Sequence, residues 1–171
     1  MKAQSKKIAL FTQVNDQLSL ANAQFLGHAG FNVAITASTQ TDLSTAVEFI
    51  GHGAMGILNE SENIGGLFTI YQKVACYFGG RINLLLLNAN ISFQEITDFS
   101  EAYFTIQYAL PYLDPEAVIL LNTGLLTREI LSSAFQKRKK QQGLNTALKC
   151  ELPKPLLSSY FNDIKLGDER S

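Results

Sequence analysis

KIALFTQVNDQLSLANAQFLGHAGFNVAITAS, residues 7–38, combines two short apolar runs with a helical pattern between them. The apolar runs cover residues 7–11 and residues 31–36. Between them, apolar side chains recur at the spacing of an amphipathic helix, which closes near Gly30. This order predicts a strand, a helix and a second strand, in which the helix carries the chain back across the sheet and the strands run parallel.

The same alternation continues along the chain. We expect further strands at residues 54–58, 82–87 and 117–121, and further helices at residues 43–50, 64–78, 95–113 and 127–152. This pattern predicts a doubly wound, Rossmann-like α/β fold with a parallel sheet, truncated after the fifth strand and the following helix. One domain would span residues 1–152, with a weakly patterned tail at residues 153–171.

Length and composition fit a single globular domain in the cytoplasm. The apolar fraction of 46% and the charged fraction of 17% exclude a disordered chain. The net charge of −1 gives no reason to expect nucleic acid or an anionic membrane as a partner. We expect no membrane span and no signal peptide. Cys76 and Cys150 both lie in helical patterns and are expected to be buried free thiols.

The turn after the first predicted strand carries the most specific signature. Residues 12–19 read TQVNDQLS, and together with their flanking strand and helix they resemble the opening of short-chain dehydrogenases/reductases of the 3-oxoacyl reductase type. That family has a Thr-Gly-x-x-x-Gly-x-Gly turn here. The chain keeps Thr12, and the degenerate positions Gln13, Gln17 and Ser19 replace the three glycines. The resemblance spans about residues 6–152 and implies a dinucleotide-binding fold.

These replacements argue against the family's cofactor. The glycines allow a tight turn and let the backbone approach a diphosphate at a helix N-terminus. Gln13 and Gln17 add side chains where a phosphate would lie, and the carboxylate of Asp16 would repel it. We therefore expect no binding of NAD or NADP.

Two further strand ends carry residues that the resemblance singles out. It places Glu60 where the family has an aspartate near the adenine, although a solvated loop or cap residue is the alternative. Asn88-Ala89-Asn90 resembles the family's Asn-Ala-Gly, with Asn90 in place of the glycine. Asn88 would brace the neighbouring strand, and Asn90 would keep a left-handed backbone.

The catalytic positions are largely lost. The resemblance places Asp98 at the family's catalytic asparagine and Thr123 at its catalytic serine, and these two residues are the catalytic candidates that it offers. The family's tyrosine and lysine, one helical turn apart, fall on Lys137 and Gln141. No tyrosine in the chain is followed by a lysine four residues later, so the general acid of the family has no counterpart.

The helix predicted at residues 95–113 matches the family's long dimerising helix. Tyr108 and Tyr112 lie four residues apart and are predicted to form a subunit contact, together with Tyr103, for which core packing is the alternative. This helix would pair in a homodimer or with a related reductase. His28 and His52 both lie near helix ends, and no Cys or His pair has the spacing of a metal site, so no metal is predicted.

The preferred hypothesis is a non-catalytic pseudo-reductase that acts as a binding or assembly subunit. A second hypothesis is a repurposed enzyme or small-ligand binder, with catalysis from Asp16, Asp98 or Glu60. Its crevice would be lined by Gln13, Asn15, Asp16, Asn88, Asn90 and Thr123. A third is a residual NAD(P)-dependent oxidoreductase with an altered site.

Overall fold

The computed structural model describes residues 6–14, 16–59, 64–88, 106–122 and 147–150. In chain order these residues form β1 (Ile8–Thr12), α1 (Gln17–His28), β2 (Asn32–Ala37), α2 (Gln40–Ile50), β3 (Met55–Leu58), α3 (Ile64–Phe78), β4 (Ile82–Asn88), the 3-10 turn η1 (Leu110–Tyr112), β5 (Leu113–Asn122) and β6 (Ala147–Cys150). Residues 106–109 are α-helical and run directly into η1.

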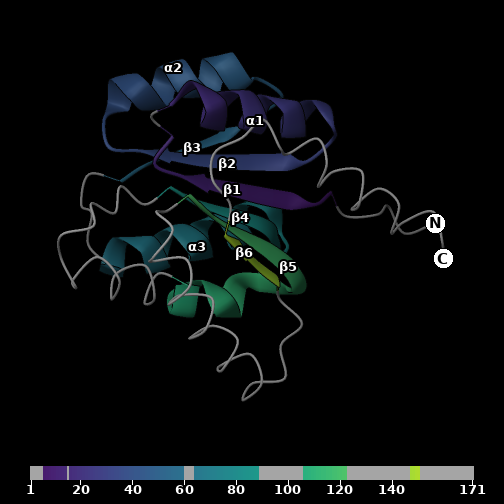
Figure 1. Ribbon diagram of the computed structural model, residues 1–171. Helices are drawn as coiled ribbons and strands as arrows, with labels where there is room; N and C mark the ends of the chain where they lie inside the picture. Colours follow the sequence, from purple (N-terminus) through teal and green to yellow (C-terminus); the bar gives the residue numbers. More distant parts are fainter. Residues whose placement is uncertain (1–5, 15, 60–63, 89–105, 123–146, 151–171) are drawn as a thin grey trace.

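The strands form one parallel sheet between two layers of helices. The order across the sheet is β3-β2-β1-β4-β5-β6, and every neighbouring pair is parallel. Helices α1 and α2 cover one face, while α3 and residues 106–112 cover the other (Figure 1). The order reverses between β1 and β4, which places their carboxyl ends at the switch point of a doubly wound sheet. The expected Rossmann-like α/β fold is confirmed.

The core lies on both faces of the sheet because successive side chains of a strand point in opposite directions. On β1, Ile8 and Leu10 pack beneath α3, whereas Ala9 and Phe11 pack beneath α1 and α2. All five residues of β1 are buried, as expected for a central strand. The apolar run on β4 is likewise buried on both faces, which confirms the sequence expectation for this strand.

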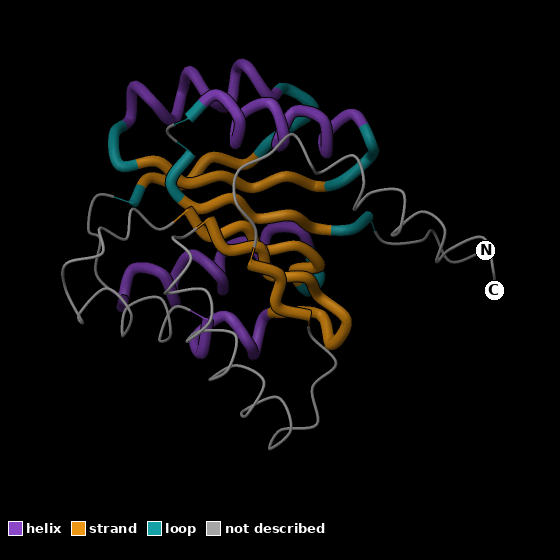
Figure 2. The backbone as a smooth tube through the Cα atoms, in the orientation of Figure 1, coloured by secondary structure: helices purple, strands orange, loops and turns teal. Residues whose placement is uncertain are grey.

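The sheet extends by one strand beyond the predicted fifth. β6 lies in the stretch where the sequence predicted a helix, and it pairs with β5 from Val118↔Ala147 to Leu121↔Cys150 (Figure 2). The helix prediction over residues 147–150 is therefore wrong. A run of four residues carries too little periodicity to decide between helix and strand, and pairing along β5 decides it here.

The helix predicted at residues 95–113 ends earlier than expected. Its described part is helical at residues 106–109, tightens into η1 and gives way to β5 at Leu113. Pro111 lies at the start of η1, and it lacks the N–H that a continuing α-helix requires. β5 begins before the predicted residues 117–121, but its pairing with β4 jumps from Leu113 to Val118, across Pro115.

Both cysteine expectations need correction. Cys76 lies in α3 as predicted but is exposed, because it falls on the outer side of this helix. Cys150 lies at the end of β6 and not in a helix. No helix within the described part of the chain is long and apolar enough to cross a membrane.

Candidate functional site

The candidate site is the carboxyl edge of the sheet, where the chain leaves β1 and enters α1. β1 ends at Thr12, whose side chain is buried and donates a hydrogen bond to the Leu86 carbonyl oxygen at 3.3 Å. This bond joins β1 to β4 across the switch point. The next residue, Gln13, has a backbone φ of 50°. The turn therefore keeps a left-handed backbone, which glycine adopts freely, at a position occupied by glutamine.

Thr36, at the neighbouring end of β2, holds this turn in place. Its hydroxyl accepts a hydrogen bond from the Gln13 amide at 2.8 Å, and its carbonyl accepts one from the Val14 amide at 2.8 Å. Thr36 is fully buried, and Val14 packs into the core beneath α1 and α2. Two adjacent backbone amides of the turn are thus hydrogen-bonded to one residue of β2. The preceding residue, Thr12, is bonded to β4, so the turn is held to both neighbouring strands.

Asp16 caps the N-terminus of α1. One of its carboxylate oxygens accepts the Ser19 amide at 2.8 Å, and the other accepts the Ser19 hydroxyl at 2.6 Å. An aspartate side chain is a preferred helix cap because it satisfies an amide that has no partner within the helix. Its negative charge also interacts favourably with the positive end of the helix dipole. An anionic group of the chain itself therefore lies at the N-terminus of α1.

The two glutamines of this turn differ in their exposure to solvent. Gln13 is half-buried, whereas Gln17, the first residue of α1, is exposed. Ser19, which the resemblance aligns with the family's third glycine, is buried and donates a hydrogen bond to Asp16.

Polar residues that follow β2 and β3 also form hydrogen bonds at the carboxyl edge of the sheet. Thr39 caps α2, accepting the Asp42 amide at 3.1 Å and donating to the Asp42 carboxylate at 2.6 Å. Asn59, just after β3, is buried, and its backbone N–H donates a hydrogen bond to the Ala37 carbonyl oxygen at 2.9 Å. The sequence reasoning missed Asn59 and Thr36. A polar residue within a buried apolar strand is the signal that could have indicated Thr36.

Several predicted site residues lie outside the described residues. These are Asn15, Glu60, Asn90, Asp98, Tyr103, Thr123, Lys137 and Gln141. Asn88 is the last residue of β4 and stands in register with Asn122 of β5, so its backbone lies at the carboxyl edge as predicted. The described part of the chain contains no group of three or more His, Cys, Asp or Glu side chains that could hold a metal ion.

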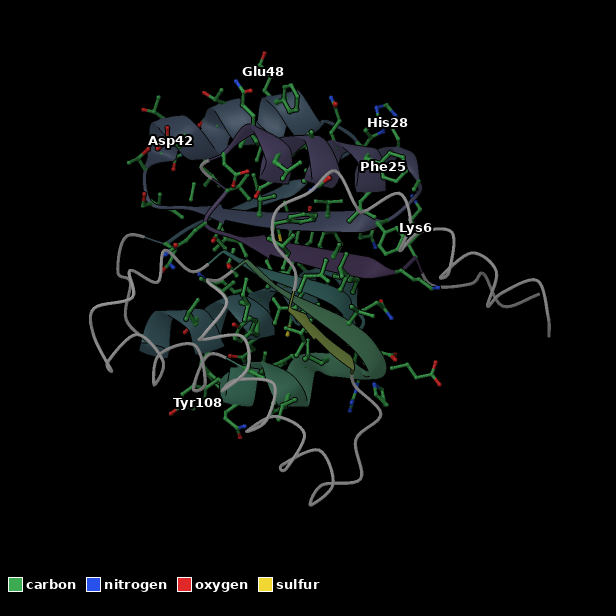
Figure 3. All side chains as sticks on the ribbon, viewed as in Figure 1. Lys6, Phe25, His28, Asp42, Glu48 and Tyr108 are labelled. Atoms are coloured by element: carbon green, nitrogen blue, oxygen red, sulfur yellow. The ribbon has the colours of Figure 1, made fainter. Side chains whose placement is uncertain are left out.

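The predicted contact residues Tyr108 and Tyr112 form an aromatic cluster with Phe68 of α3. The Phe68 ring lies 6.2 Å from the Tyr108 ring and 5.6 Å from the Tyr112 ring, both in edge-on geometry. Phe68 is 40% exposed and Tyr108 is 41% exposed. Figure 3 shows Tyr108 on the outer side of the layer that α3 and residues 106–112 form. The cluster therefore presents aromatic surface at the face opposite α1 and α2.

Comparison with known proteins supports the fold. No protein-family model matches the sequence, and no curated protein matches it. Among solved structures, a short-chain dehydrogenase/reductase from Serratia marcescens superposes with a TM-score of 0.67 at 14% identity, over 86% of this chain and 74% of its own. LigD from a Sphingobium species, in its apo form, gives a TM-score of 0.71 at 14% identity, over 93% of this chain and 86% of its own.

A metagenomic short-chain oxidoreductase, solved in complex with NADP, gives a TM-score of 0.67 at 15% identity, over 88% of this chain and 84% of its own. The chain therefore has the fold of the short-chain dehydrogenases/reductases. Identities of this size establish the shared architecture, and the function has to be argued from the residues at the site.

Proposed function

We propose that this chain is a non-catalytic protein of the short-chain dehydrogenase/reductase fold that acts as a binding or assembly subunit. The observation that carries the proposal is the double hydrogen bond from Ser19 to the Asp16 carboxylate at the N-terminus of α1. The proposal has two parts: the site does not bind a dinucleotide, and the aromatic cluster of Phe68, Tyr108 and Tyr112 pairs with a second copy or a related subunit.

The first part rests on the occupant of the α1 N-terminus. Folds of this type bind a dinucleotide's diphosphate at this place, where free helix amides and the helix dipole attract an anion. Here the Asp16 carboxylate already accepts the Ser19 amide. An incoming diphosphate would have to displace this carboxylate and lie beside its negative charge. The residues of the turn do not fit the diphosphate, and we derive no hydride transfer for this chain.

The second part rests on the exposed aromatic rings of the opposite layer. Tyrosine and phenylalanine are enriched in protein interfaces because they bury a large area, and a tyrosine hydroxyl also finds polar partners. Phe68 and Tyr108 hold each other in edge-on contact, so their rings form a preorganised surface. A two-fold axis through this cluster would place the same rings of two copies against each other, as in most homodimers.

Calorimetric titration of the purified chain with NADPH and with NADH tests the first part. We expect no saturable heat at cofactor concentrations up to the millimolar range. Asp16→Asn is the matched variant, since it removes the charge and keeps a side chain that caps helices well. Saturable micromolar binding of either cofactor to the wild-type chain would overturn the non-catalytic proposal.

Sedimentation equilibrium tests the second part. We expect a wild-type dimer, and we expect Tyr108→Lys to shift it towards monomer because a charge would be buried at the contact. Tyr77→Lys is the matched control, since Tyr77 is 66% exposed on α3 but lies outside the aromatic cluster. A wild-type chain that stays monomeric at high concentration, alone and mixed with a reductase of this fold from the same host, would contradict the assembly role.

A further inference from the structure

The only two histidines of the chain lie against each other. His28 is the last residue of α1, and His52 lies two residues beyond the last residue of α2, so the fold brings together residues that are far apart in sequence. Their ring centroids are 4.1 Å apart, with an angle of 64° between the ring planes. Both side chains are exposed. In Figure 3, His28 and Asp42 lie at opposite ends of the layer that α1 and α2 form. The histidine pair is therefore separate from the carboxyl edge of the sheet.

His52 lies in a stretch of left-handed backbone at the end of α2. His52 has a φ of 53°, in the left-handed region, between Gly51 at 64° and Gly53 at 71°. A histidine in this conformation is strained where a glycine would not be. On its other side, a Cβ added to Gly27 would come within 3.3 Å of the His52 Cβ. The His52 side chain therefore packs against Gly27, and a larger side chain at position 27 would press on it.

We propose that His28 and His52 form a two-imidazole binding site for a divalent transition-metal ion of the Zn²⁺ class. Imidazole nitrogens bind Zn²⁺ at about 2.0–2.1 Å, so two of them on one tetrahedral ion lie about 3.4 Å apart. Rings whose centroids are 4.1 Å apart reach this separation by rotation about their side-chain bonds, and both side chains are exposed. Water completes the coordination of the ion.

The position of the pair favours a cation. Each histidine lies at the C-terminal end of a helix, where the carbonyl groups of the last turn carry partial negative charge. Two such helix ends meet at the pair, and each attracts a metal ion. A bound ion would join the ends of α1 and α2 and would stabilise the folded chain, since the unfolded chain does not hold the two imidazoles together.

Calorimetric titration of ZnCl₂ into the full, untagged chain tests the proposal. We expect saturable binding of one ion per chain. His28→Gln and His52→Gln should each weaken the affinity by about tenfold or more, because each removes one of two ligands. Both histidines are exposed, so far-UV circular dichroism should report unchanged folding for the two glutamine variants.

A second readout uses the small number of histidines. The chain contains two, so its proton NMR spectrum holds two sets of imidazole signals. Both sets should shift together as Zn²⁺ is added. The control is Cys76→Ser combined with Cys150→Ser, which removes every thiol and should leave binding unchanged. Loss of binding in this thiol-free variant, a shift of only one imidazole, or undiminished binding by His52→Gln would each overturn the proposal.

Discussion

The carboxylate of Asp16 binds both the amide and the hydroxyl of Ser19, at 2.8 Å and 2.6 Å. Asp16 precedes α1, and Ser19 lies at the position that the resemblance aligns with the family's third glycine. The serine hydroxyl supplies one of the two bonds, and a glycine at that position could not. The serine and the aspartate therefore support each other, and together they form a closed cap at the N-terminus of α1.

Asp16→Ala should lower the free energy of unfolding by about 1–2 kcal/mol, because the Ser19 amide loses its partner. Asp16→Asn should stay within about 0.5 kcal/mol of wild type, since asparagine caps helices as well as aspartate does. Urea denaturation followed by far-UV circular dichroism measures both. Equal stability of Asp16→Ala and the wild-type chain would show that this cap contributes nothing.

Thr36→Val should destabilise the fold by about 1–2 kcal/mol, because the part-buried Gln13 amide would lose the hydroxyl that accepts its hydrogen bond. Valine has the same shape, so no cavity forms. Thr45→Val is the matched control, since the Thr45 hydroxyl bonds to the Thr41 carbonyl at an exposed position. It should change stability by no more than about 0.5 kcal/mol. Thermal and urea unfolding compare the two variants, and equal effects would contradict the anchoring role of Thr36.

Gln13→Gly should keep the turn and leave stability unchanged or raise it by up to about 1 kcal/mol, because glycine adopts a φ of 50° without strain. Gln13→Val should lower stability by about 1–2 kcal/mol, since a β-branched side chain is strongly disfavoured in the left-handed region. The difference between the two variants in urea denaturation measures the backbone strain. A valine variant as stable as the glycine variant would mean that the turn does not need this conformation.

The sequence predicts those parts of the fold that depend on local pattern. The continuous apolar run of β4 and the helical spacing of α3 both identify their elements without any knowledge of neighbours. β6 was missed because its four residues become a strand only through pairing with β5, which lies far away in the sequence. A periodicity argument cannot detect this kind of non-local contact.

The same distinction between local patterns and non-local contacts applies to the candidate site. Asp16 was predicted as a charge that repels phosphate, yet its role as a cap was also readable, because an aspartate before a helical run is a local signal. Thr36 could not be assigned in this way, since its partner Gln13 lies 23 residues earlier. The contact between His28 and His52 depends on how the ends of α1 and α2 meet, and the sequence records only that both lie near helix ends.

Gly56→Ala should destabilise the contact between β3 and α2. A Cβ at this position would lie 2.8 Å from Val47 Cγ2 and 3.1 Å from Leu43 Cδ1, so α2 would have to move. We expect a loss of about 1–3 kcal/mol, the usual range for overpacking. Combining Gly56→Ala with Val47→Ala should recover part of this loss in thermal unfolding. No recovery in the double variant would place the clash elsewhere.

Tyr71 of α3 is fully buried beneath the sheet, and its hydroxyl makes no hydrogen bond with the described residues. Burial raises the pKa of the Tyr71 phenol well above its ordinary value, because the phenolate would have to exist in an apolar environment. The folded chain therefore keeps this proton at alkaline pH. The unfolded chain loses it above about pH 10, where an ordinary tyrosine ionises.

Tyr71→Phe should raise the free energy of unfolding by about 1 kcal/mol at pH 7, because it removes a buried hydroxyl that has no partner. Below about pH 10 both states keep the proton, so the tyrosine adds no pH dependence; above it the unfolded state binds fewer protons, and stability falls as pH rises. The advantage of Tyr71→Phe should therefore grow between about pH 9 and 11. Urea titrations across this range measure it, with the exposed Tyr77→Phe as control. A constant difference between Tyr71→Phe and wild type would contradict the raised pKa of Tyr71.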